Sequence, residues 1–116
     1  MIRLTLTLHP AVWLTANQRL HWSTRMRRTR MLRALAASEA RITGAAGKRL
    51  GASTVTAVIG YPTPAVKAII DGLVDARVWD DDDHRHIPSV AFTRDPNKSP
   101  KGTHTVTLII QEQETR

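Results

Sequence analysis

Four consecutive aspartates, Asp80 to Asp83, stand between a tryptophan and two histidines in the stretch VWDDDDHRHIP at residues 78–88. They make up four of the ten acidic residues of the chain. Carboxylate oxygens are the ligands that Mg²⁺ prefers, and carboxylates that hold such ions beside a phosphodiester promote its hydrolysis. The run therefore suggests a Mg²⁺ site, and the alternative is a solvated acidic turn that follows a helix.

Lys67 precedes the aspartates on the polar side of a predicted helix that leads directly into them. Two roles are open for this side chain. It can pair with Asp71 one helical turn later, which would contribute only slightly to stability. It can also supply positive charge to a phosphate in the transition state, if the helix brings it close to the acidic run.

His84 and His86 follow the aspartates at a spacing of two. Imidazole suits transition metals, but the arrangement matches no zinc pattern. Two residues at this spacing also lie on one side of a strand, so we favour that interpretation, with phosphate contact by the protonated rings as another.

The basic residues are concentrated at the start of the chain. The net charge is +7, and residues 1–38 contain seven arginines and no Asp or Glu. Clustered arginines in a basic chain are typical of nucleic-acid-binding proteins, and the alternative is a protein that is simply basic and soluble. Trp22 is placed to stack on an exposed base or to join the core, whereas Trp13 is expected in the core. The candidate DNA ligands are Arg19, His21, Arg25, Arg27, Arg28 and Arg30.

Hydrophobic periodicity indicates the elements that must position these groups. Period-two alternation predicts strands over residues 2–8 and 103–111, and β-branched or apolar runs predict strands over 53–60 and 87–93. A helix is expected from the cap Ser23 to about Ile42, closed by Gly44 and Gly47. A second, capped by Thr63 with Pro64 in its first turn, carries apolar residues at the amphipathic spacing. The order β-α-β-α-β-β predicts one α/β domain over residues 1–116, with two helices on a single sheet of about four mixed strands.

The chain has no cysteine, which excludes disulfides and thiolate metal sites and suits a reducing cytoplasm. No apolar run approaches the length of about 20 residues needed to span a membrane. The alternating N-terminus, MIRLTLTLHP, also lacks the continuous apolar core of a signal peptide.

The stretch VKAIIDGLVDARVWDDDDHRHI at 66–87 resembles the RusA family of Holliday junction resolvases, particularly its phage-type members. The segments TANQRLHW at 15–22 and SPKGTHTVTLII at 99–110 add to the resemblance. It implies a homodimeric endonuclease that cuts four-way DNA junctions with Mg²⁺ during recombination and repair. Lys67 and Asp82 match the family's catalytic positions, and Asp82, Asp81 and Asp83 are the implied metal ligands.

The chain departs from the family pattern just before the lysine. The family carries acidic residues there, whereas GYPTPAVK at 60–67 has none, and Tyr61 and Thr63 stand near their places. Three hypotheses follow. The first is a Mg²⁺-dependent junction endonuclease impaired by the missing acids, and the second is a relative that binds branched DNA without cutting it. The third is a basic adaptor for RNA or protein.

Overall fold

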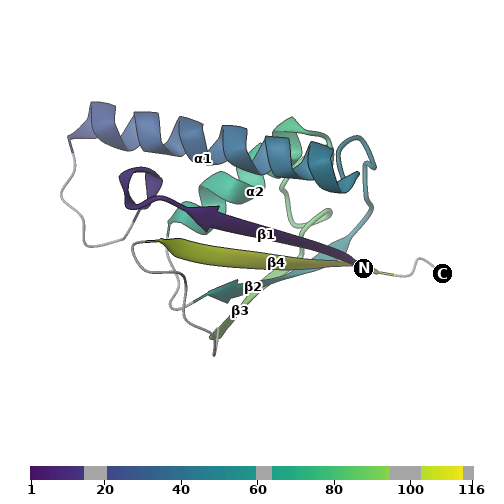
Figure 1. Ribbon diagram of the computed structural model, residues 1–116. Helices are drawn as coiled ribbons and strands as arrows, with labels where there is room; N and C mark the ends of the chain where they lie inside the picture. The colour runs from purple at the N-terminus through teal and green to yellow at the C-terminus, as the bar shows by residue number, and fades with distance from the viewer. Residues whose placement is uncertain (15–20, 60–63, 95–102, 114–116) are drawn as a thin grey trace.

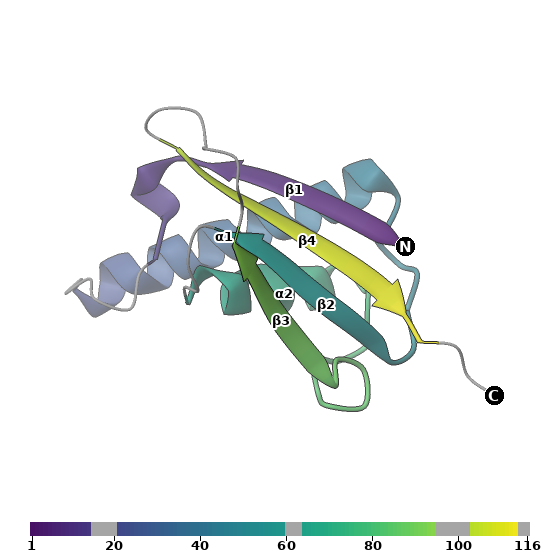
Figure 2. The same ribbon diagram turned by 90° about the horizontal axis from the view of Figure 1, so that it is seen from below.

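A four-stranded sheet and two helices that cover one of its faces make up the computed structural model of the chain, which describes residues 1–14, 21–59, 64–94 and 103–113. Figure 2 shows the sheet in front of both helices. The predicted small α/β fold with a mixed sheet is therefore confirmed, and a short 3₁₀ helix that the sequence pattern does not predict follows the first strand. The elements are β1 (Ile2–Leu8), η1 (Pro10–Val12), α1 (Trp22–Thr43), β2 (Ser53–Ile59), α2 (Ala65–Asp75), β3 (Ser89–Arg94) and β4 (His104–Glu112).

The sheet has the strand order β1-β4-β2-β3. β4 pairs antiparallel with both β1 and β2, and β2 pairs in parallel with β3. Two parallel strands need a crossover connection. Here α2 provides it together with residues 80–85, which we call the acidic segment. β3 thus lies at one edge of the sheet, and the acidic segment enters it directly.

The core fills the space between the sheet and the helices. Leu4, Leu6 and Leu8 of β1 are buried and alternate with exposed residues, as period two predicts. On α2, Val66, Ile69, Ile70 and Leu73 are buried, so the predicted amphipathic side is the packed one. Trp13 is also buried, as expected. Its ring stacks on His104 of β4 with 4.3 Å between centroids, and burial lowers the pKa of that histidine.

α1 and its cap begin two residues earlier than predicted. His21, not Ser23, caps it, because the Nδ1 atom of His21 accepts a hydrogen bond from the backbone N–H of Ser23 at 3.3 Å. The helix ends at Gly44, whose φ of 80° is the left-handed conformation that glycine adopts without strain. The expected cap of α2, Thr63, lies outside the described residues. Among the helices described, none is both long enough and apolar enough to cross a membrane.

The two helices pack closely at Gly72. A Cβ atom at this position would lie 2.3 Å from the carbonyl oxygen of Arg33 and 2.9 Å from the Cβ of Ala36. Both distances are far below a normal contact, so the packing of α1 on α2 requires glycine here. Arg33 then reaches past the contact to the C-terminal end of α2.

Candidate functional site

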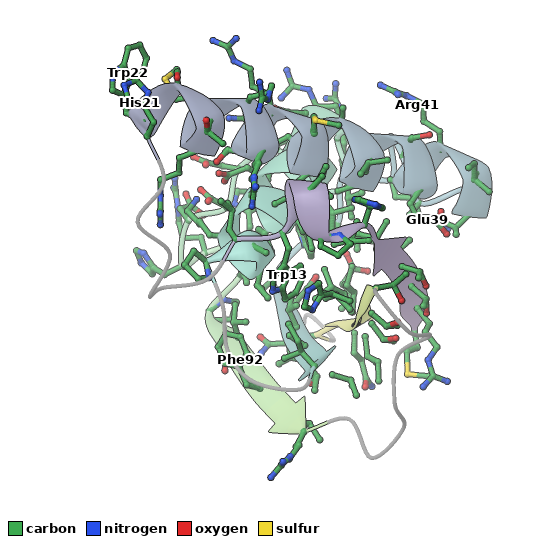
Figure 3. The ribbon with its side chains drawn as sticks, turned by 60° about the vertical axis from the view of Figure 1, so that its left-hand side comes forward. Trp13, His21, Trp22, Glu39, Arg41 and Phe92 are labelled. Carbon is green, nitrogen blue, oxygen red and sulfur yellow. The ribbon has the colours of Figure 1, made fainter. Side chains whose placement is uncertain are left out.

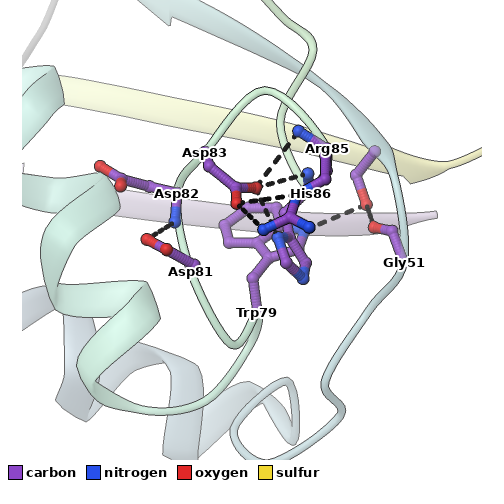
Figure 4. Close-up of polar contacts among 8 residues, drawn as sticks. Gly51, Trp79, Asp81, Asp82, Asp83, Arg85 and His86 are labelled. Carbon is purple, nitrogen blue, oxygen red and sulfur yellow. Dashed lines mark hydrogen bonds and ion pairs between the residues drawn. The ribbon is translucent and has the colours of Figure 1, made fainter.

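The residues that flank the acidic segment on both sides are hydrogen-bonded to Ser53, the first residue of β2. The side chain of Trp79 is fully buried, and its Nε1 donates to the Oγ of Ser53 at 3.1 Å. The backbone N–H of Ser53 donates to the carbonyl of His86 at 2.8 Å. Residues 80–85 therefore form a bend whose place beside α2 is fixed by the core (Figure 4).

Lys67 joins two carboxylates. Its Nζ donates to Asp71 at 2.6 Å and to Asp82 at 2.5 Å. Both predicted roles of Lys67 are thus compatible with its place, since it pairs with Asp71 and also lies against the acidic run. Its hydrogen bonds to Asp71 and Asp82 raise its pKa, and the hydrogen bond from Lys67 lowers the pKa of Asp82. The side chain of Lys67 is 66% exposed, so a phosphate can reach it.

The other aspartates of the run point elsewhere. Asp83 accepts hydrogen bonds from the side chains of Arg85 and His86 and from the backbone N–H groups of both. The hydrogen bond with the His86 ring is the main reason why the pKa of Asp83 lies far below its usual value. Asp81 accepts from the backbone N–H of Asp82 at 2.7 Å. Figure 4 shows Asp82 and Asp83 turned to opposite sides of the bend.

The structure therefore does not bring Asp81, Asp82 and Asp83 together as one set of ligands. Within the described ranges, no group of three or more histidines and carboxylates is placed to hold a metal ion. What converges is a pair, Asp71 and Asp82, on either side of one ammonium. Mg²⁺ is often held by only one or two carboxylates, with water or phosphate oxygens as the remaining ligands. The pair has the donor chemistry for such an ion, provided that Lys67 moves aside.

Replacing Lys67 with methionine is expected to raise the pKa of Asp82, because Asp82 then faces Asp71 without a cation. In the wild type, the pair stabilises the fold above the pKa that Asp82 has in the unfolded chain, and its contribution is lost as the pH falls and Asp82 is protonated. The contribution is small because Lys67 is mostly exposed. A carboxyl-carbon NMR titration measures the shift, with Lys48→Met as the control. An unchanged Asp82 titration in the Lys67 variant would contradict the assignment.

The N-terminal half of α1, which is rich in arginine, forms the second part of the candidate site. Arg25, Arg27 and Arg30 have no carboxylate within ion-pair distance in the part of the chain that the structure describes. Arg28 differs, since it is half-buried and donates to the carbonyl of Trp13 at 2.9 Å. Arg19 lies outside the described residues. Figure 3 shows nitrogen-tipped side chains along the outer side of α1, with His21 and Trp22 at its end.

The arginines near the acidic residues differ from those in the N-terminal half of α1. Arginines beside the acidic residues are paired: Arg33 with Asp75 at 2.8 Å, Arg49 with Asp80 at 3.7 Å and Arg85 with Asp83 at 3.0 Å. These pairs cancel part of the negative charge around α2 and the acidic segment. Arg25, Arg27 and Arg30 follow closely on one another in the N-terminal half of α1, so a polyanion would find several unpaired guanidinium groups there.

One member of the site is not evident in the sequence. From the sequence, Asp71 is expected only as a helix partner of Lys67 that contributes slightly to stability, whereas the structure places it with Asp82 on the same cation. The i, i+4 spacing is a visible signal of its contact with Lys67. Its proximity to Asp82 depends on the return of the chain after Trp79, which no local pattern specifies.

Comparison with known proteins gives no relative for this chain. The sequence matches no protein-family profile, and no curated protein sequence shows significant similarity to it. The family resemblance of residues 66–87 therefore stays a prediction.

Proposed function

We propose that this chain binds DNA, with branched DNA as its preferred target, through the N-terminal half of α1. The observation that carries the proposal is a group of three arginines on α1, Arg25, Arg27 and Arg30, for which the described residues supply no carboxylate partner, whereas Arg33, Arg49 and Arg85 are each paired with an acid. Guanidinium groups bind phosphate with a rigid fork of donors, and α1 presents three of them along one helix. Phosphate contacts of this kind supply most of the affinity for nucleic acid.

The preference for four-way junctions rests on the resemblance of residues 66–87 to the RusA family. A junction has approximate two-fold symmetry, so a homodimer with two equivalent basic helices would match it. In this proposal the chain acts as a homodimer in the cytoplasm, on DNA formed during recombination and repair.

Mg²⁺-dependent cleavage is a second candidate, favoured by the convergence of Asp71 and Asp82 on Lys67. These two carboxylates would hold the ion, which would supply charge stabilisation at the scissile phosphate. Lys67, released from the pair, would donate to a phosphate oxygen in the transition state. We rank cleavage below binding, because the described residues offer two carboxylates and because GYPTPAVK carries no acid.

One assay tests both DNA binding and DNA cleavage. Purified protein is incubated with a labelled four-way junction or with a matched linear duplex, in Mg²⁺ or in EDTA, and each sample is run on native and denaturing gels. The binding proposal expects a junction-selective shift in EDTA and in Mg²⁺, without nicks. Paired nicks in the junction that require Mg²⁺ would instead establish cleavage.

If nicks occur, Asp82→Asn is expected to lower their rate by at least about 100-fold, since it removes a charged metal ligand. Asp80→Asn is the matched control, because Asp80 pairs with Arg49 outside the Lys67 cluster. Unchanged cleavage in the Asp82 variant would exclude the assignment. Equal shifts of junction, linear duplex and RNA would favour the third hypothesis, a basic adaptor.

A further inference from the structure

Trp22 is the one tryptophan of the chain that lies on the surface. Its side chain is 68% exposed, whereas Trp13 and Trp79 are 4% and 0% exposed. It stands in the first turn of α1, and Met26, one turn later, is also exposed. Five helical turns take about 18 residues, so Trp22 lies on the same side of α1 as the buried Ala40. The side of α1 that packs in the core thus continues, at its N-terminal end, into an apolar surface.

The ring of Trp22 is held in a defined setting. The neighbouring His21 ring lies 5.7 Å away, tilted by 34°. His21 is itself fixed, because its Nδ1 lies 2.7 Å from the Oγ of Ser23. Two aromatic surfaces therefore meet at the end of α1 (Figure 3).

Positive charge surrounds this aromatic surface. A hollow of about 390 Å³ beside the ring is lined by Trp22, Met26 and Thr29 and by three arginines, Arg25, Arg30 and Arg33. Its volume falls within the range of about 300–1,000 Å³ that is usual for small-molecule sites. An aromatic plane with a rim of guanidinium groups is complementary to a nucleobase and its flanking phosphates.

We propose that Trp22 is a stacking platform for an unpaired base, with Arg25 and Arg30 holding the adjacent phosphates. The inference rests on the proposed DNA binding and names the feature of the DNA that is recognised. A base inside a duplex is stacked between its neighbours and cannot reach the ring, whereas single strands offer unstacked bases and the open centre of a junction uncovers the faces of its innermost base pairs. A second copy of the chain fits this surface poorly, because a two-fold contact here would bring like charges together.

The test compares two single strands of equal length, one of thymidines and one in which the central positions are abasic. Both present the same phosphates, so only the bases differ. Trp22→Ala is expected to weaken binding of the thymidine strand by about 5- to 100-fold and to leave the abasic strand within twofold. Trp22→Phe should retain most of the affinity. Ile42→Ala, an exposed apolar residue near the other end of α1, is the matched control and should change neither.

Tryptophan fluorescence gives an independent readout, because the other two rings are buried. The thymidine strand should quench the emission of the wild type, and the Trp22→Phe variant should lose that quenching. Equal losses on both strands in Trp22→Ala, or no loss on either, would overturn the stacking role while leaving DNA binding intact. A shift of Trp22→Ala to a smaller sedimenting species, without a base-dependent loss, would assign the surface to contact between copies. If the wild type binds neither strand nor a junction, the proposed function fails as well.

Discussion

Replacing Arg25, Arg27 and Arg30 together with alanine is expected to weaken DNA binding by about 100-fold, taking about 1 kcal/mol for each phosphate contact. The slope of log affinity against log salt should fall by about three, one unit for each arginine that no longer neutralises a phosphate. Alanine is the strongest helix former, so α1 should remain folded. Anisotropy of a labelled four-way junction, titrated at several KCl concentrations, measures both quantities.

The matched control for this variant removes the same charge elsewhere. Arg3, Lys48 and Arg94 are exposed and lie on β1, after α1 and on β3. Their triple alanine variant also lowers the net charge by three, yet it should retain most of the affinity. Equal reductions of affinity in the two triple variants would mean that binding follows net charge alone and that α1 is not the interface.

Replacing Gly72 with alanine is expected to destabilise the protein by about 2 kcal/mol, within the range found for overpacked contacts. The added Cβ would meet the backbone of Arg33, which cannot move without shifting α1 away from α2. The effect opposes helix propensity, which by itself favours alanine over glycine by about 1 kcal/mol. Urea unfolding monitored by circular dichroism gives the change in the free energy of unfolding.

Gly51→Ala serves as the reference for this substitution. A Cβ at Gly51 would lie 3.5 Å from the side chain of Glu112, an ordinary contact, so little change is expected. A Gly72→Ala variant as stable as the wild type, or more stable, would show that the helices are not packed as closely as the structure has them.

The fold could be predicted because its elements have strong local patterns. Alternating leucines in Ile2–Leu8 allow only one side of that strand to be buried. The spacing of Val66, Ile69, Ile70 and Leu73 does the same for α2. The reason for Gly72 was not predictable. Helix propensity alone makes glycine a weak point within a helix, and only the approach of Arg33 makes it a requirement here.

The site was predicted less completely because it depends on contacts between distant segments. The sequence left open whether Lys67 lies near Asp82, and the structure brings the two side chains into contact. The run of four aspartates suggested one shared site, but adjacent side chains on a bend diverge, so Asp83 serves the turn and Asp82 faces α2. For Trp22, the sequence left open whether the side chain is buried in the core or exposed. α1 extends beyond the core at its start, and composition does not reveal where the core ends.

Pairing between charges explains how an acidic run can coexist with the proposed DNA binding. Uncompensated carboxylates beside a basic surface would repel phosphates. Here Asp75, Asp80 and Asp83 each lie against an arginine, and Asp82 lies against Lys67. Much of the negative charge is neutralised locally, and Arg25, Arg27 and Arg30 of α1 are not drawn into these pairs.

The most direct test of the account is a competition measurement. A labelled four-way junction is bound to the protein near physiological salt and displaced by unlabelled linear duplex of the same sequence and length. The account predicts that displacement requires a concentration of duplex about tenfold or more above that of unlabelled junction, since specific binding exceeds non-specific binding. Displacement by duplex and junction at the same concentration would contradict the recognition of branched DNA.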